Sequence, residues 1–183
     1  MYTKNLLKTG EAHARTGDLY ETPPGALDAV LERLPPAAPL WEPFPGEARR
    51  STQHMRARGR DVVNKAEGAS DDFWEQPPLP ERVMLTNPPF SQKVRLFRWL
   101  QEHPAQRAVL LIPVEALQTA YLDALLTARG VRPALLYFTR RLKFLEPDTG
   151  EPLRRPFPYG VGWLEIPPAG GEPLLPALSP ATA

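Results

Sequence analysis

The sequence predicts an α/β fold: a mostly parallel sheet of the seven-stranded type, with an antiparallel hairpin at its edge and helices on both faces. Short apolar runs alternate along the chain with segments whose apolar residues recur every three or four positions, the pattern of βα units. The run at 108–113 is almost entirely apolar, as expected of a central parallel strand. With 183 residues and 42% hydrophobic content, the chain can bury one sizeable core.

The first half of the folded region is expected to form two helices and two short strands. Thr22 precedes Pro23 and Pro24, and this order predicts a helix that Thr22 caps and that ends near residue 34. The elements expected next are a strand at 40–42, a helix at 51–58 ended by Gly59, and a strand at 61–63.

The second half is expected to continue the alternation and to finish with two paired strands. The expected elements are a strand at 82–86, a helix at 92–102 capped by Ser91, a strand at 108–113, a helix at 115–128, and strands at 134–138 and 159–164. The last two can pair as an antiparallel hairpin at the sheet edge. Residues 167–183 are rich in Pro, Gly and Ala without periodicity, so we expect a loosely structured tail. The predicted division is an N-terminal arm at 1–16, a folded domain at 17–166 and this tail.

Composition excludes several classes of site. The chain has no cysteine, which excludes disulfides and thiolate chemistry, and its three histidines are scattered, so no metal site is expected. No apolar run is long enough to span a membrane, and residues 1–15 lack the hydrophobic stretch of a secretory signal. We therefore expect a cytoplasmic protein with no membrane partner.

The motif with the most chemical content is Asn87-Pro88-Pro89-Phe90, between a predicted strand and a predicted helix. Ligands bind at the carboxyl ends of strands in open α/β sheets. The Asn side-chain carbonyl and a backbone carbonyl fixed by two prolines can both accept hydrogen bonds from one exocyclic amine, and the Phe ring can stack on the heterocycle that bears it. In a chain with 24 prolines, several Pro-Pro pairs are expected by chance, so the pair alone has little predictive value. The prediction therefore depends on the strand before the motif and the helix after it.

Cations gather in the C-terminal third, although the net charge of +1 gives no overall attraction to nucleic acid. The cluster consists of Arg129, Arg132, Arg140, Arg141, Lys143, Arg154 and Arg155, with Tyr and Phe residues interleaved. This mixture suits phosphate contacts combined with base stacking. The equally weighted alternative is a solvated loop whose charges keep it soluble.

Five segments together resemble a known family. They are residues 20–23 (Tyr-Glu-Thr-Pro), 41–46 (Trp-Glu-Pro-Phe-Pro-Gly), 72–74 (Asp-Phe-Trp), 86–91 (Thr-Asn-Pro-Pro-Phe-Ser) and 141–158, which includes Arg-Leu-Lys-Phe-Leu and Pro-Phe-Pro. Over residues 17–166 the chain resembles the class I S-adenosylmethionine-dependent methyltransferases and, within them, the small phage and prophage type of DNA N6-adenine methyltransferase. This resemblance implies a Rossmann-like fold.

The resemblance also implies an activity, a cofactor and a set of site residues. The implied activity is methylation of the N6 amine of adenine in duplex or single-stranded DNA, site-specific or of low specificity, with S-adenosyl-L-methionine as methyl donor. The implied catalytic residues are Asn87, Pro88, Pro89 and Phe90. The implied cofactor-binding residues are Tyr20, Thr22, Pro23, Glu42, Phe44, Gly46, Asn64, Asp72, Phe73 and Asn87. Nucleic acid would be bound by Arg140, Arg141, Lys143, Arg154 and Arg155.

Two departures from the family pattern fall in the predicted cofactor region, and other functions stay open. The loop after Phe44 has fewer glycines than usual, and Asn64 stands where the family places an acidic residue for the ribose hydroxyls. One alternative is a methyltransferase of the same fold that acts on an RNA base or a glutamine amide. The other is an inactive nucleic-acid-binding or phage accessory protein. The sequence predicts neither the recognition site nor the oligomeric state.

Overall fold

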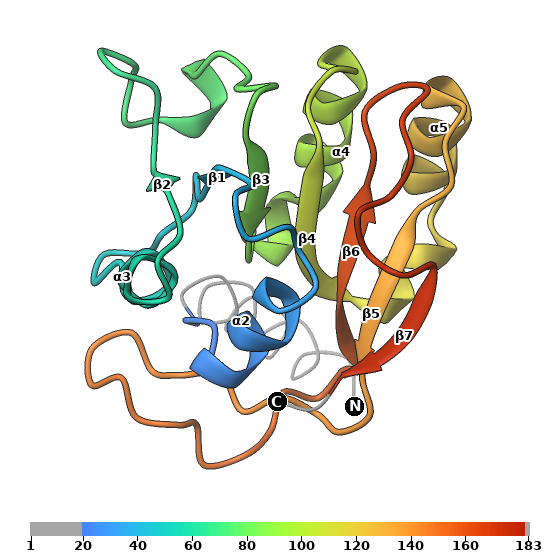
Figure 1. Ribbon diagram of the computed structural model, residues 1–183. Coiled ribbons are helices and arrows are strands. Elements are labelled where there is room, and N and C mark those ends of the chain that lie inside the picture. The colour runs from blue at the N-terminus through green and yellow to red at the C-terminus, as the bar shows by residue number, and fades with distance from the viewer. Residues whose placement is uncertain (1–19, 182–183) are drawn as a thin grey trace, which may run out of the picture.

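The computed structural model describes residues 20–181, and their framework is one seven-stranded sheet (Figure 1). Its strands are β1 (Leu40–Trp41), β2 (Val62–Val63), β3 (Val83–Thr86), β4 (Ala108–Pro113), β5 (Ala134–Phe138), β6 (Val161–Ile166) and β7 (Leu178–Ala181). They lie in the order β2-β1-β3-β4-β6-β5-β7. β6 is antiparallel to both neighbours, and every other pairing is parallel. The predicted mostly parallel α/β sheet is confirmed.

Helices cover both faces of the sheet, as the alternation of strand residues requires. They are α2 (Pro24–Leu31), α3 (Arg50–Ala57), α4 (Lys93–Glu102) and α5 (Ala120–Arg129), with short 3-10 turns η1 (Phe73–Glu75), η2 (Phe90–Gln92) and η3 (Val114–Gln118). Leu85 and Val109 belong to the buried cluster that contains α2 and Met55 of α3. Their chain neighbours Met84 and Leu110 belong to a second cluster, with α4 and α5. Successive strand residues thus enter opposite layers, and Figure 1 shows α2 and α3 on the other side of the sheet from α4 and α5.

The last three strands differ from the prediction. β5 and β6 do pair in antiparallel fashion, but β6 is not at the edge: it is inserted between β5 and β4, where Ala108 pairs with Ile166 and Pro113 with Val161. The edge strand is β7, which lies in the segment predicted to be loosely structured. That prediction is wrong for β7 because Leu175 and Ala181 are buried, although the local sequence has no strand periodicity. Pro180, which has no N–H to donate, is tolerated in β7 because an edge strand leaves one row of its N–H groups unpaired.

Helix boundaries also correct two capping predictions. Pro23, not Thr22, is the N-cap of α2, and no side chain caps that helix. Ser91 lies inside η2, and α4 begins after Gln92. Two predicted helix ends are confirmed: Gly59 and Gly130 take φ values of 76° and 63°, which glycine adopts without strain. By contrast, α2 ends at Leu31 and not near residue 34, and the helix predicted at 115–128 is divided into η3 and α5.

The topology brings the functional motifs to one edge of the sheet. Because β1, β3, β4 and β5 are parallel, their carboxyl ends share an edge, and β6 starts there. The segment 139–160, here called the long loop, crosses this edge and lies beneath α2 in Figure 1. No helix in residues 20–181 combines the length and the apolar character needed to cross a membrane.

Candidate active site

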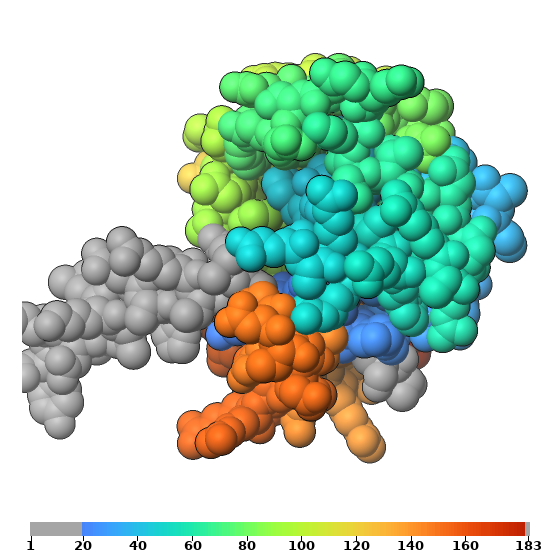
Figure 2. Space-filling model, turned by 90° about the vertical axis from the view of Figure 1, so that its left-hand side faces the viewer, coloured from blue at the N-terminus to red at the C-terminus, as the bar shows by residue number. Residues whose placement is uncertain are grey.

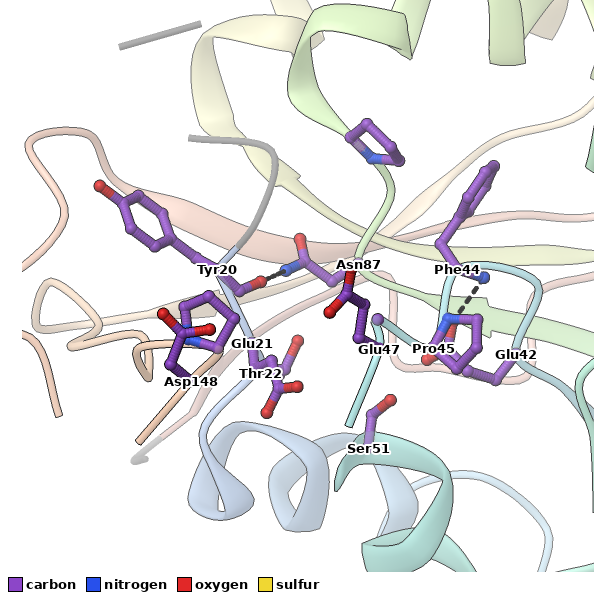
Figure 3. A pocket seen from close by; sticks show the side chains of 13 residues that line it. Tyr20, Glu21, Thr22, Glu42, Phe44, Pro45, Glu47, Ser51, Asn87 and Asp148 are labelled. Carbon is purple, nitrogen blue, oxygen red and sulfur yellow. Dashed lines mark hydrogen bonds between the residues drawn. The ribbon is translucent and has the colours of Figure 1, made fainter. Parts of the chain in front are cut away.

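A cavity of about 500 Å³ opens at the carboxyl ends of β1 and β3. Its walls come from five parts of the chain: the segment 20–22, the loop after β1, Ser51 at the start of α3, the Asn87 loop after β3, and the long loop at 147–148. Figure 3 shows Asn87 in the middle, with Tyr20, Glu21 and Asp148 on one side and Glu42, Phe44 and Pro45 on the other. Four of the five segments with family resemblance therefore meet in one place.

The side chain of Asn87 is oriented by its own hydrogen bond. Its Nδ2 donates to the backbone carbonyl of Tyr20 at 3.3 Å. Since a carbonyl can only accept, this bond fixes which end of the amide is nitrogen. The Oδ1 atom is buried and has no hydrogen-bond partner among the described residues. A buried, unpartnered acceptor costs roughly 1–3 kcal/mol, and a ligand donor such as an amine would relieve that cost.

Four carboxylates line the cavity, namely Glu21, Glu42, Glu47 and Asp148, and no Lys or Arg does. We call it the acidic cavity. Glu21 and Glu42 are buried, whereas Glu47 and Asp148 are exposed at the rim. Fixed negative charge around a partly enclosed space attracts cations and repels phosphates. The cavity therefore favours a positively charged ligand.

Glu42 forms the floor of the acidic cavity directly after β1. One of its oxygens, Oε1, accepts hydrogen bonds from the Phe44 N–H at 3.1 Å and from Thr86 Oγ1. Complete burial raises the pKa of Glu42 to about 7, and hydrogen bonds from Thr86, Phe44 and Ser51 only partly oppose this shift. An approaching cation would favour the ionised form and lower this pKa again.

Glu21 is a site residue that the sequence analysis missed. Its Oε2 accepts a hydrogen bond from Arg50 Nη1 at 2.6 Å, and the same nitrogen donates to the carbonyl of Pro147 at 2.6 Å. Its Oε1 is buried and has no partner in residues 20–181. Arg50 thus ties the cavity wall to the long loop, which Figure 2 shows as an orange lobe beneath the cyan residues around the start of α3. In the sequence, the only indication that Glu21 belongs to the site was the family resemblance of the segment 20–23. The role of Glu21 could not be predicted because it depends on Arg50, which is distant in the chain.

A second cavity of about 510 Å³ adjoins the first and shares Pro45, Gly46 and Glu47 with it. Asn64 lines it after β2, and both protons of its amide are already used: Nδ2 donates to Glu42 O and to Thr52 Oγ1, each at 2.8 Å. Its carbonyl oxygen is the atom left to accept from a ligand. Gly46 has φ of 67°, a backbone conformation that residues with a side chain rarely adopt, and its α-carbon faces Glu21, since a Cβ there would lie 3.4 Å from Glu21 Oε1.

The structure does not bring Asp72 and Phe73 to either cavity. Asp72 is exposed, and its Oδ1 accepts from the Trp74 N–H at 3.0 Å, so it caps η1. Phe73 is buried in an aromatic cluster, with its ring centroid 4.6 Å from that of Phe44 and 5.0 Å from that of Trp99. Both residues were predicted to contact a cofactor, and in this structure both have structural roles. Phe44 connects the two regions because it also lines the acidic cavity.

The other residues of the Asn-Pro-Pro-Phe motif have distinct positions. Pro89 lines the acidic cavity beside Asn87, and Pro88 is buried. The half-buried Phe90 ring contacts Phe144 and Phe157 of the long loop, with centroid distances of 6.4 and 5.4 Å. Phe90 also lines a groove of about 320 Å³ next to the acidic cavity, which we call the outer groove. Its principal walls are Phe90, Lys93, Glu115, Thr119, Phe157 and Tyr159.

The predicted nucleic-acid-binding cations are exposed on the long loop. These residues are Arg140, Arg141, Lys143, Arg154 and Arg155. The first three line a cavity of about 330 Å³ together with Pro23, which the structure thus places away from the acidic cavity.

Arg129, a member of the same sequence cluster, is instead buried. Its guanidinium donates to the carbonyls of Leu100, His103, Gln106 and Pro167. Burial lowers the pKa of Arg129 to about 10. Arg129 therefore holds the fold together and does not belong to a binding surface.

Comparisons with known proteins assign no family to this chain. Neither a scan against protein-family models nor a search of curated proteins finds a match to this chain. Within residues 20–181, no three His, Asp or Glu side chains gather in a way that could hold a metal ion.

Proposed function

We propose that this protein is an S-adenosylmethionine-dependent methyltransferase whose substrate is the N6 amine of adenine in DNA. The observation that carries the proposal is the Asn87 amide, which is fixed by Tyr20 and presents a buried, unpartnered carbonyl oxygen beside the acidic cavity. An α/β sheet with the motif at a strand's carboxyl end is compatible with this activity. The resemblance in the sequence gives the proposal its specific substrate.

The donor set of the two adjoining cavities fits the proposed cofactor. S-adenosylmethionine carries a sulfonium and an ammonium group, and the buried carboxylates Glu21 and Glu42 suit such cations. The carbonyl oxygen of Asn64 can accept from a ribose hydroxyl in the second cavity. A ligand rich in phosphate would be repelled by the exposed rim carboxylates Glu47 and Asp148. When bound, the cofactor supplies a methyl carbon that an amine attacks directly, with the electron pair of the broken bond remaining on sulfur.

The protein's own residues would position the amine. Asn87 Oδ1 and the carbonyl of Pro88 would each accept one proton of the exocyclic amine, which directs the nitrogen lone pair toward the acidic cavity. Phe90 would support the heterocycle at the border between the acidic cavity and the outer groove. The main contributions are alignment and exclusion of water, since the attacked carbon is already a strong electrophile. The proton lost from nitrogen after transfer passes to water.

The proposal is tested by methyl transfer with labelled cofactor. The full chain is incubated with tritiated-methyl S-adenosylmethionine and, in separate reactions, duplex DNA, single-stranded DNA, structured RNA or protein. The products are then digested, and N6-methyladenine is measured by mass spectrometry. We expect N6-methyladenine in DNA. Label in RNA or protein alone would support the alternative substrates and contradict the DNA proposal.

A calorimetric titration with S-adenosylmethionine separates an enzyme from an inactive relative. Binding together with methyl transfer supports the proposal. No detectable binding and no transfer would leave an accessory protein that uses the fold without turnover.

A further inference from the structure

We infer that the outer groove binds a second nucleobase, the neighbour of the methylated adenine in the target strand, and that Tyr159 and Glu115 select it. This inference rests on the proposed function, because it assumes a strand whose adenine amine lies at Asn87. It adds a candidate recognition site at the same edge of the sheet as the Asn87 loop.

Aromatic rings form a path from Phe90 into the groove. The Phe90 and Phe157 centroids are 5.4 Å apart, and those of Phe157 and Tyr159 are 5.6 Å apart. Phe157 is buried, whereas Tyr159 is 53% exposed, which is unusual for a large ring on this protein. Exposed rings next to a channel for nucleic acid stack on bases. Tyr159 therefore offers the stacking surface for a base beyond the one at Phe90.

The groove is separate from the position of the target amine. Neither Asn87 nor Pro89 lines it, although both line the acidic cavity, and only Phe90 of the motif does. A base whose amine is held at Asn87 would therefore rest at the border. The outer part, at Glu115 and Tyr159, stays open to another heterocycle. Its volume of about 320 Å³ is at the small end of ligand sites, which suits a single base.

The polar atoms of the groove define which base fits. No hydrogen bond or ion pair within residues 20–181 involves the Glu115 carboxylate, so its oxygens can accept from an exocyclic amine. Thr119 Oγ1 already donates to the carbonyl of Ala116 at 2.7 Å, so toward a ligand it too is an acceptor. Lys93 Nζ donates to the Phe90 carbonyl at 3.3 Å and has further protons to give. Glu115 and Thr119 would accept from an exocyclic amine, and Lys93 would donate to a ring nitrogen. Cytosine and adenine have such an amine next to a ring acceptor, whereas thymine has no amine, so they match the groove better.

The segment of the long loop that leads to Phe157 and Tyr159 carries cations that suit a strand of nucleic acid. Arg154 and Arg155 are exposed and come shortly before Phe157 in the chain. They can hold the phosphates on either side of a base stacked on Tyr159. An apolar peptide would use the rings but would leave these cations without partners.

The test compares methylation of oligonucleotides that differ only in the base next to the target adenine, varied on each side in turn. Wild-type kcat/KM should be at least tenfold higher with cytosine or adenine than with thymine on one of the two sides. Tyr159→Ala should raise KM about tenfold, and Glu115→Ala should reduce the discrimination between neighbouring bases to within about threefold. Tyr121→Ala and Glu102→Ala, which remove an exposed ring and an exposed carboxylate outside the groove, should behave as wild type.

Two outcomes keep the inference distinct from the proposed function. If DNA is methylated but no neighbour is preferred and Tyr159→Ala is unchanged, the inference is overturned while the methyltransferase proposal stands. If no nucleic acid is methylated, binding of a fluorescent single-stranded oligonucleotide decides the question. Weaker binding by Tyr159→Ala than by Tyr121→Ala then supports a base-stacking groove, and equal binding overturns it.

Discussion

The acidic cavity and the outer groove are lined by consecutive residues of one loop, Pro89 and Phe90 respectively, yet they differ in the side chains around them. The acidic cavity has two buried carboxylates, and two buried oxygen atoms, on Glu21 and Asn87, have no hydrogen-bond partner among residues 20–181. The outer groove has two exposed side chains in its walls, Glu115 and Tyr159, and the long loop that supplies Phe157 and Tyr159 carries exposed cations. One side thus suits a small cation and the other a polyanion. Two ligands of opposite charge can meet at Phe90 without competing for the same groups.

The comparison also explains how much each change should matter. Groups that are buried and unpartnered contribute strongly and specifically, because water cannot replace their missing bonds. Exposed cations contribute small, salt-dependent increments. Single substitutions in the acidic cavity should therefore abolish most of the activity, whereas each single substitution on the long loop should lower DNA affinity by a small amount.

The largest effect is expected for Asn87→Ala. Methyl transfer should fall about 1,000-fold, roughly 4 kcal/mol of activation free energy, because the amine loses its oriented acceptor. Cofactor affinity measured by calorimetry should stay close to wild type. Gln92→Ala, an exposed residue just beyond the motif, is the matched control. Normal transfer by Asn87→Ala would remove the basis of the proposed function.

Glu42 should make folding stability depend on pH. Its pKa rises from 4.5 to about 7 on folding, so between these values the folded state holds a proton that the unfolded state has released. The free energy of unfolding should therefore decrease as pH rises from about 4.5 to about 7, by roughly 3 kcal/mol in total from this group. Urea denaturation across this range should show that slope in wild type and lack it in Glu42→Gln.

Glu47→Gln is the control for this experiment, since Glu47 lines the same cavity but is exposed. It should keep the wild-type pH dependence. A Glu42→Gln variant with the same slope as wild type would mean that Glu42 is ionised in the folded protein at pH 6.

Arg129→Met should test whether membership of the basic sequence cluster implies binding. We expect a loss of about 2 kcal/mol in the free energy of unfolding, because four carbonyls lose their donor. Arg132→Met, a nearby exposed member of the cluster, should leave stability unchanged. Equal stabilities of the two variants would show that the carbonyls find other partners.

The smallest effect is expected for single cations of the long loop. Arg141→Ala should weaken DNA binding severalfold and reduce the slope of log affinity against log salt by about 1. Fluorescence anisotropy at several salt concentrations measures both quantities. Arg98→Ala, on the exposed side of α4, provides the comparison. An unchanged slope in Arg141→Ala would place the nucleic-acid path elsewhere.

Local patterns were sufficient for much of the fold. The apolar run of β4 and the alternation of β3 with α4 predicted central parallel strands, because burial on both faces leaves a direct mark on composition. The same patterns could not predict the position of β6 within the sheet, since either strand of a hairpin can be the one that pairs with the rest of the sheet. They also missed β7, whose place depends on pairing with β5 more than on its own residues.

The sequence by itself determined the position of Asn87 at the end of a strand, because a strand, two prolines and a helix in succession leave few other arrangements. Only the tertiary structure decided that Tyr20 orients its amide, that Glu21 joins the site through Arg50, and that Phe90 lines a groove distinct from the cavity at Asn87. It also separated the buried Arg129 from the exposed cations. The physical reason is that burial, hydrogen bonding and charge pairing act between residues far apart in the chain, and sequence spacing does not record those distances.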